Sequence, residues 1–247
     1  MEREDQLREI LLMPICCKKA NEGIVKEDGI IQSGQKYYSN ADGDMSDYAI
    51  GFYEILYKDI LESRSILKRN GHLYSRNFAG DTMNSFHTIA NITPGAGKTR
   101  KQRESKEEWP KFLQDYYNKY HCLANFWLIP MKMGRTTAGK FNKARRPISD
   151  YMDRYLQMLF SEIDFEERDR DYFKCFDSKN DFACKHFLIE AYVDKNLNVD
   201  LYSESHQNES EFLVEKALEN MRLRADSIAK SKYTDELWEY FKAYHLV

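Results

Sequence analysis

The chain has 247 residues and a formal net charge of −3, with 42% hydrophobic and 14% aromatic residues. This content supports a sizeable core, so we expect a folded, soluble chain. The longest apolar runs, such as LANFWLIPM, are too short to cross a bilayer, and the acidic start MEREDQLREI lacks the order of a secretory signal. Five scattered cysteines fit a reducing compartment. These features exclude a membrane-spanning protein and predict a cytoplasmic one.

The residue pattern predicts a mainly α-helical fold in a single domain over residues 1–247. The 17 Tyr and 14 Phe against 11 Gly and 5 Pro favour helices over a turn-rich β design. Strand content is expected to be low, with a small hairpin in GIVKEDGIIQSGQKYY. The expected helices are, in chain order, 4–12, a long one from Ser46 or Asp47 to Gly71, one from the Ser105–Glu108 capping box through Tyr120, one from the cap Ser149 to about Ile163, and three around 179–194, 209–230 and 235–245, the last capped by Thr234.

The segment NITPGAGKTRKQR looks like a phosphate-binding loop. A Walker loop needs G-x-x-x-x-G-K-[ST], because its first glycine lets the backbone wrap the phosphates, and Ile92 occupies that position here. The chain also lacks the series of buried parallel strands that carries such a loop. We therefore expect no NTPase, and we assign Lys98 and Arg100 to a basic surface.

Positive charge is concentrated between Pro94 and Ser149, which contain 13 Lys and Arg against 4 Asp and Glu. The part from Met131 to Ser149 contains no acidic residue. Such a loop suits the phosphates of a nucleic acid or another polyanion. The alternative is a solvated loop whose charges balance the acidic remainder of the chain. The candidate phosphate-binding residues are Lys98, Arg100, Arg135, Lys140, Lys143, Arg145 and Arg146.

Two polar islands, GDTMNSFHTIAN and YHCLANFWLIP, lie in apolar surroundings. Each has a His four residues before an Asn: His87 precedes Asn91, and His121 precedes Asn125. On a helix this spacing places the imidazole and the amide on one face. The alternative is that each side chain satisfies buried backbone groups. The pocket predicted from these islands contains His87 and Asn125, surrounded by Asp81, Asn84 and His121.

The segment DTMNSF, followed by YHCLANFWLIP and then DYMDRYL, resembles a group of uncharacterised bacterial proteins. These proteins share an S-D-T-M-N-S-F-like segment and a Y-H-x-[IL]-[AG]-N-F-x-L-x-P-like segment. The resemblance covers a motif core of about residues 75–160. It implies a bacterial cytoplasmic protein.

The segment HCLANFWLIP, with the basic GKFNKARR after it, is also similar to the HNH nuclease domains of modification-dependent restriction enzymes. This similarity implies that His87 is the general base and Asn125 the positioning amide. It also implies that Asn142 and Lys143 lie near the phosphate. The chain departs from the family at Phe86, where the family has an acidic residue.

A divalent metal ion is the cofactor that such a nuclease would use. The candidate metal ligands are Asp81 and His121, with His121 in place of the family's second metal-binding His. His121 is also a candidate catalytic residue beside His87 and Asn125.

Two functions of different classes follow from these observations. The first is a nucleic-acid-directed or phosphodiester-directed protein, in the form of a divergent nuclease in phage or mobile-element conflict. The second is a non-catalytic helical module that binds a protein or a nucleotide ligand. The sequence leaves open the ligand, the metal ion and the oligomeric state.

Overall fold

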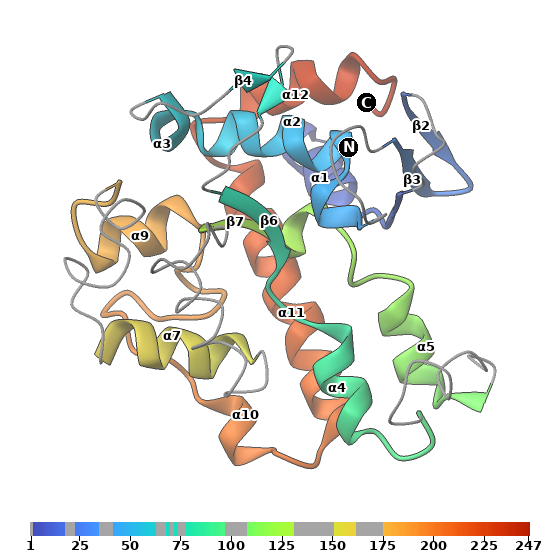
Figure 1. Cartoon of the computed structure of the whole chain (residues 1–247), viewed down its shortest axis with the longest axis vertical. Coiled ribbons are helices and arrows are strands. Elements are labelled where there is room, and N and C mark those ends of the chain that lie inside the picture. Colours follow the sequence, from blue (N-terminus) through green and yellow to red (C-terminus); the bar gives the residue numbers. More distant parts are fainter. Residues whose placement is uncertain are drawn as a thin grey trace.

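Helices dominate the described part of the chain, and small sheets connect them (Figure 1). The prediction of a mainly α-helical fold is confirmed for the described residues. One cluster of buried apolar side chains extends from Leu7 to Leu246, while the single-domain organisation stays a prediction. The computed structural model describes residues 2–17, 23–34, 42–62, 68–69, 72–73, 78–96, 108–130, 151–161 and 175–247.

The N-terminal residues form a helix and a three-stranded sheet. Helix α1 (Arg3–Leu11) lies where the sequence predicts it. Strands β2 (Ile24–Glu27) and β3 (Ile30–Ser33) form the expected antiparallel hairpin around the Asp28–Gly29 turn. Both turn residues have positive φ, 49° and 75°, which is the backbone that an Asp-Gly hairpin turn adopts. Strand β1 (Ile15–Cys17) adds to β3 in parallel, and its three residues are too few to show a strand pattern in the sequence.

The long helix expected after Ser46 starts as predicted. Ser46 is the N-cap of helix α2 (Asp47–Leu56), and its hydroxyl accepts a hydrogen bond from the N–H of Ala49. The helix ends early, because Tyr57 has a φ of −114° and its buried hydroxyl lies 2.9 Å from Nδ1 of His186. The Tyr57 ring therefore packs in the core at the residue where helix α2 ends.

The predicted extension of this helix to Gly71 is wrong. A short helix, α3 (Lys58–Glu62), follows Tyr57. Strands β4 (Lys68–Arg69) and β5 (His72–Leu73) then pair antiparallel. Apolar residues continue through this segment, so its helical periodicity did not reveal where the helix breaks.

Two strands that the sequence did not predict join the polar islands. Strand β6 (Phe78–Thr82) pairs antiparallel with β7 (Phe126–Pro130) across the centre of the molecule (Figure 1). The 3-10 helix η1 (Gly43–Met45) packs directly on β6 because Gly80 has no side chain. A Cβ at Gly80 would lie 2.0 Å from the carbonyl oxygen of Asp44.

The helices around these strands follow the prediction in part. Helix α4 (Phe86–Ile92) contains the first His and Asn pair. Helix α5 (Lys111–Tyr117) starts after its N-cap Pro110, later than expected, and the predicted cap Ser105 lies outside the described residues. The second His and Asn pair is not on an α-helix, since only the 3-10 helix η4 (Leu123–Asn125) precedes β7. The helical-face argument for that pair is therefore wrong.

The C-terminal part is helical apart from one loop. Helices α11 and α12 confirm the last two predicted helices, but the predicted cap Thr234 is wrong, because Tyr233 is the N-cap of α12 and Thr234 is its first residue. Helix α9 ends at Lys185 and not near residue 194, because Phe187 and Glu190 have positive φ, 57° and 68°. The prediction of a helix through FLIEAYVD is therefore wrong. The elements are α7 (Met152–Ser161), α9 (Lys179–Lys185), α10 (Tyr202–Ser205), α11 (Ser210–Ala229) and α12 (Thr234–Lys242).

Helix α11 runs through the centre of the molecule, in contact with α1, α4, α5 and η4 (Figure 1). Its Arg224 is 0% exposed and donates hydrogen bonds to the carbonyl oxygens of His186 and Ala124, at 2.9 and 2.7 Å. Arg224 thereby satisfies carbonyl groups next to Asn125. The central helix fixes the position of η4, where the second polar island turns into a strand.

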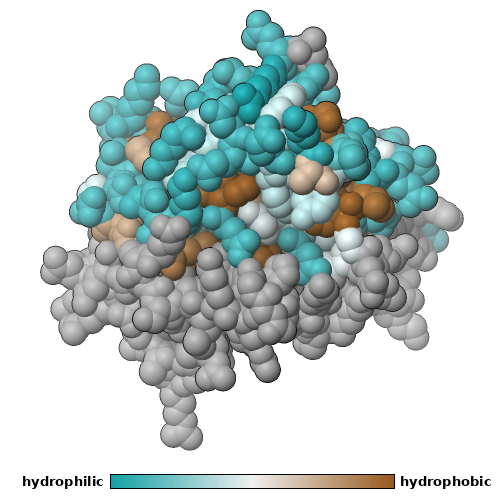
Figure 2. Space-filling view, turned by 90° about the horizontal axis from the view of Figure 1, so that it is seen from above, coloured by the Kyte–Doolittle hydropathy of each residue, from teal (hydrophilic) through white to brown (hydrophobic). Residues whose placement is uncertain are grey.

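The face that carries α12 is mostly hydrophilic, with apolar side chains in patches between polar ones (Figure 2). Among the described residues, the large hydrophobic side chains that are exposed are Val25 and Val247. None of the described helices is long and apolar enough to cross a membrane.

Candidate functional site

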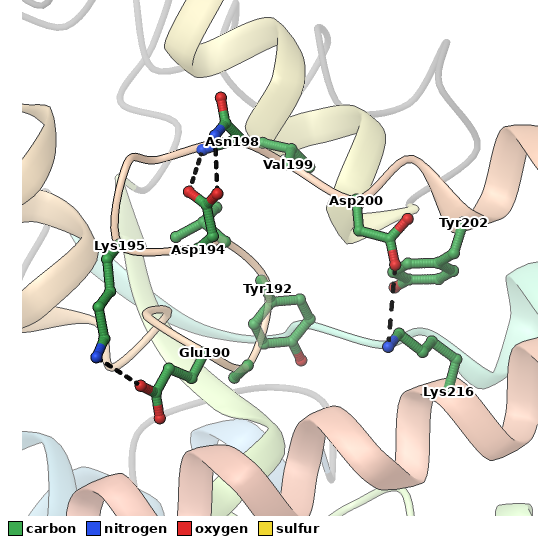
Figure 3. A pocket seen from close by; sticks show the side chains of 11 residues that line it. Glu190, Tyr192, Asp194, Lys195, Asn198, Val199, Asp200, Tyr202 and Lys216 are labelled. Atoms are coloured by element: carbon green, nitrogen blue, oxygen red, sulfur yellow. Dashed lines mark hydrogen bonds and ion pairs between the residues drawn. The ribbon is translucent and has the colours of Figure 1, made fainter.

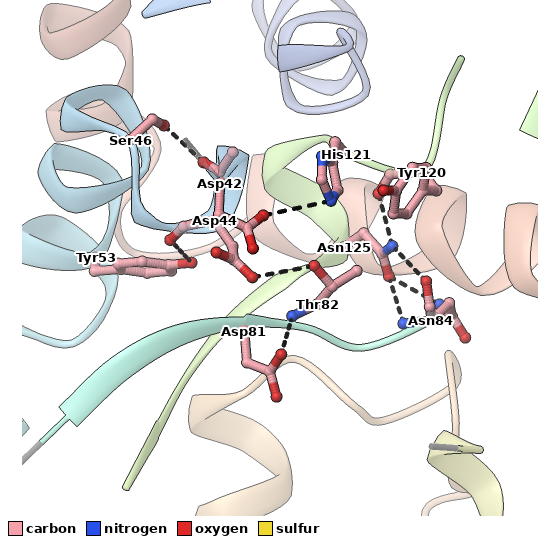
Figure 4. A network of polar contacts seen from close by, with 11 residues as sticks. Asp42, Asp44, Ser46, Tyr53, Asp81, Thr82, Asn84, Tyr120, His121 and Asn125 are labelled. Atoms are coloured by element: carbon pink, nitrogen blue, oxygen red, sulfur yellow. Dashed lines mark hydrogen bonds and ion pairs between the residues drawn. The ribbon is translucent and has the colours of Figure 1, made fainter. Parts of the chain in front are cut away.

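Two asparagines connect the polar islands, and we name this contact the amide junction. The Oδ1 atom of Asn125 accepts hydrogen bonds from the backbone N–H and from Nδ2 of Asn84, at 2.9 and 3.0 Å. The Nδ2 atom of Asn125 donates to the carbonyl oxygens of Asn84 and Tyr120, at 3.2 and 2.7 Å. Asn125 is 0% exposed, and its amide makes the four hydrogen bonds of which it is capable (Figure 4).

These contacts fix the orientation of the Asn84 amide. A backbone N–H only donates, so the Asn125 atom that it meets is the oxygen, and the Asn84 atom that faces this oxygen is the nitrogen. The same nitrogen donates to the hydroxyl of Tyr192 at 2.6 Å. The Tyr192 hydroxyl therefore accepts, and its own proton is directed elsewhere. No acceptor for this proton is found among the residues that the structure describes.

Tyr192 lines a cavity of about 540 Å³, which we name the outer cavity (Figure 3). This volume lies within the range of small-molecule sites, about 300–1,000 Å³. The walls come from the loop of residues 190–200, from the start of α10 and from α11. Its polar lining residues are Glu190, Tyr192, Asp194, Lys195, Asn198, Asp200, Tyr202 and Lys216.

The loop that forms this wall is held in a strained but well-bonded conformation. Two of its side-chain-bearing residues have positive φ: Glu190 and Leu197, at 68° and 64°. Such backbone persists where the surroundings determine it, and it is frequent at binding sites. The Asp194 carboxylate fixes the turn by accepting hydrogen bonds from the N–H groups of two following residues and from Nδ2 of Asn198. The wall is therefore formed before a ligand arrives.

The charged side chains at the rim pair with one another. Lys195 lies 3.7 Å from Glu190, and Lys216 lies 4.0 Å from Asp200 and 3.0 Å from Glu219 (Figure 3). Hydrogen bonds from Asn198 lower the pKa of the Asp194 carboxyl, so it remains ionised. The cavity lining contains three carboxylates and two ammonium groups. Its formal charge is therefore −1.

A second, much smaller cavity of about 20 Å³ lies beside the amide junction, and we name it the inner cavity. Tyr202 lines both cavities. The inner cavity brings the first polar island next to the segment DYMDRYL, so two of the three segments of the predicted motif core meet here. Its lining residues are Asn84, Ser85, Thr88, Ile89, Tyr151, Met152, Tyr202, Leu213 and Ala217.

Asp153 and Arg154 of α7 hold the start of α10 in place. The Asp153 carboxylate, 0% exposed, accepts a hydrogen bond from the N–H of Ser203 at 2.8 Å. Burial raises the pKa of the Asp153 carboxyl, and the hydrogen bonds from Ser203 oppose that change. Arg154 donates to the hydroxyl and the carbonyl oxygen of Ser203, both at 2.8 Å. These bonds position the neighbouring Tyr202 between the two cavities.

The Asn125 amide bonds to Asn84 and Tyr120 and to neither of the predicted catalytic histidines. His87 is exposed at the start of α4. His121 stacks on Tyr120, and its Nε2 atom lies 3.7 Å from Oδ1 of Asp42 (Figure 4). Burial lowers the pKa of the His121 imidazole to about 4, Asp42 opposes this shift, and His87 adds to it. The two histidines are therefore close enough to interact electrostatically, while the Asn125 amide is fully used in the junction.

The two predicted metal ligands, Asp81 and His121, are separated by the β6 strand. The Asp81 side chain points away from His121 (Figure 4), and its Oδ1 atom accepts a hydrogen bond from the N–H of Thr82 at 2.8 Å. Within the described ranges, no three His, Cys, Asp or Glu side chains gather in a group that could hold a metal ion.

The predicted phosphate-binding residues lie outside the described residues. They are Lys98, Arg100, Arg135, Lys140, Asn142, Lys143, Arg145 and Arg146. Their role therefore stays a prediction, and so does the nuclease.

Comparison with known proteins finds no family model, no curated protein and no solved structure that matches the chain. The two resemblances noted in the sequence therefore stay predictions.

Sequence reasoning missed the tyrosines around the junction. Tyr116 donates to the carbonyl oxygen of Asn84 at 2.9 Å, and Tyr192 accepts from its side chain. Tyr192 lies 67 to 108 residues beyond the two asparagines that it joins, and nothing in its local sequence marks it. The one available signal was Asn84 itself, a polar residue within the first polar island.

Proposed function

We propose that the protein is a helical module that binds a small ligand in the outer cavity. The proposal keeps the non-catalytic helical module of the second function that the sequence leaves open, and it replaces the protein or nucleotide ligand expected there by a small molecule. The observation that supports it most directly is the Tyr192 hydroxyl, which accepts a hydrogen bond from Asn84 and keeps its own proton for another partner. Burial raises the pKa of the Tyr192 phenol, so this proton is present at neutral pH.

The surroundings of Tyr192 support binding and not only packing. Buried tyrosine hydroxyls usually bond to a protein group, as the Tyr53 hydroxyl does when it donates to the carbonyl oxygen of Asp44 at 2.9 Å. Tyr192 instead borders a cavity with charged and amide groups on its rim. Its ring is held from behind by the amide junction. A preformed wall of this kind reduces the entropy that a ligand must lose on binding.

Ligand-observed NMR tests this proposal with four sets of probes: nucleosides, nucleotides, amino acids and saccharides. We expect at least one set to bind the wild-type protein. Val199 lines the outer cavity, so Val199→Trp should fill it and weaken binding at least about tenfold.

The matched control is Val25→Trp on the exposed hairpin, where the side chain is 56% exposed. This variant should bind as the wild type does. The proposal fails if no probe binds, or if Val199→Trp, shown to be folded by circular dichroism, keeps full affinity.

A further inference from the structure

Five of the residues that line the inner cavity carry a side-chain oxygen atom that makes no hydrogen bond to another described residue. Ser85, Thr88, Tyr151 and Tyr202 each contribute a hydroxyl to the lining residues, and Asn84 contributes an amide oxygen. None of these five oxygen atoms makes a hydrogen bond to another residue in the described part of the chain. Thr88, Tyr202 and Asn84 are only 8%, 7% and 6% exposed.

Polar groups in a recess of this kind bond to water or to a ligand that displaces the water. A ligand that replaces these bonds with its own polar groups keeps them satisfied, whereas an apolar ligand would leave them unpaired at a cost of about 1–3 kcal/mol each. These atoms also differ from the polar atoms that are sealed in the core without a partner, a set that includes the Tyr48 hydroxyl and contains none of the five. The inner cavity therefore presents its polar atoms to whatever enters it.

The volumes of the two cavities and the charge of the outer lining restrict the chemical class of that partner. A volume of about 20 Å³ admits one oxygen-sized group, whereas the outer cavity of about 540 Å³ admits a ring. Hydroxyl groups both donate and accept, so a hydroxyl of the ligand complements a lining made of hydroxyls and an amide oxygen. The outer lining, with a formal charge of −1, disfavours a phosphate group.

We propose that the two cavities together bind a sugar ring, either as a free saccharide or as the ribose of a nucleoside. This inference rests on the proposed function and names its ligand class. The ring occupies the outer cavity beside Tyr192 and Lys216. One of its hydroxyls passes Tyr202 and enters the inner cavity, where Thr88 and Asn84 bind it.

Isothermal titration tests this inference with D-glucose, D-ribose and uridine, each beside its 2-deoxy or 2′-deoxy counterpart, and with uridine 5′-monophosphate. At least one sugar should bind the wild-type protein, and uridine should bind more tightly than its phosphate. Glucose or ribose binding without uridine binding identifies a saccharide site, and the reverse identifies a nucleoside site. Tyr202→Phe and Thr88→Val each remove one hydroxyl at nearly constant shape, and each should weaken binding about threefold to tenfold.

The matched control is Tyr48→Phe, which removes a buried hydroxyl beside Tyr240 and Phe241 and should leave affinity unchanged. Absence of binding by all the sugars would overturn the inference. So would equal affinities in Tyr202→Phe, Thr88→Val and the wild type. A different ligand that Val199→Trp excludes, but that these two variants bind normally, would overturn the sugar assignment and leave the proposed function standing.

Discussion

The amide junction and the inner cavity share Asn84 but differ in how their polar groups are satisfied. In the junction, the Asn125 amide makes four hydrogen bonds to protein atoms and is 0% exposed. In the inner cavity, the hydroxyls of Thr88 and Tyr202 make no hydrogen bond to other described residues. Saturated polar groups fix the fold, and unsaturated ones are available to a ligand.

The difference also changes the interpretation of the polar islands. Their amides and histidines suggested a catalytic pocket, yet the Asn125 amide has no capacity left for a substrate. The sequence also allowed that each of these residues satisfies buried backbone groups. The structure shows this role for Asn125. Four predictions test the distinction, in order of decreasing effect.

Asn125→Ala should have the largest effect, a loss of about 4 kcal/mol in the free energy of unfolding. The change removes four hydrogen bonds and leaves two carbonyl oxygens and two donors of the junction without them. Urea denaturation monitored by circular dichroism measures it. Asn196→Ala, at an exposed position of the cavity loop, is the control and should cost less than about 0.5 kcal/mol. Similar losses in both variants would contradict the structural role of the junction.

Gly80→Ala should destabilise the protein by about 3 kcal/mol, since the added Cβ would meet the Asp44 carbonyl oxygen at 2.0 Å and the Tyr53 hydroxyl at 2.6 Å. The strand would have to move away from η1, and the junction at its end would move with it. Thermal unfolding of the variant measures the effect. An unchanged melting temperature would show that the strand does not pack against η1 as described.

Acidification from pH 7 to pH 5 should remove about 2 kcal/mol of stability through His121. Burial lowers the pKa of its imidazole to about 4 in the folded protein, from the ordinary value of 6.5. The unfolded chain therefore takes up the proton first, so stability is complete above pH 6.5 and falls as the pH drops towards 4. Urea denaturation at both pH values should show a smaller fall in His121→Gln than in the wild type. Equal falls in stability in the variant and the wild type would show that His121 does not cause the loss at low pH.

Tyr192→Phe and Tyr202→Phe give the sharpest comparison and the smallest effects. Tyr192→Phe should cost about 1 kcal/mol, because Nδ2 of Asn84 loses an acceptor at 2.6 Å. Tyr202→Phe should change stability by less than about 0.5 kcal/mol, because its hydroxyl makes no hydrogen bond to the described residues. Paired denaturation curves measure the difference. Equal losses of stability would contradict the proposed difference, in which the Tyr192 hydroxyl bonds to the protein and the Tyr202 hydroxyl does not.

Local signals predicted several elements well. The Asp28–Gly29 hairpin and the Ser46 cap depend on neighbours within a few residues, so their sequence patterns were sufficient. Strands β6 and β7 are far apart in sequence, 52 residues in the pairing of Phe78 with Pro130, and each is short. Their polar and apolar residues fit a helix or a loop equally well until the partner strand is known.

The sequence by itself determined that the chain is mainly helical, that its N-terminal part contains a hairpin, and that polar residues are concentrated in two islands. Only the tertiary structure decided what those polar residues do. Asn125 and Thr88 are both buried and polar, but three of the four hydrogen bonds that saturate Asn125 come from Asn84, 41 residues away, while Thr88 borders a cavity. Hydrogen-bond saturation depends on contacts between distant segments, and no local pattern in a sequence records it.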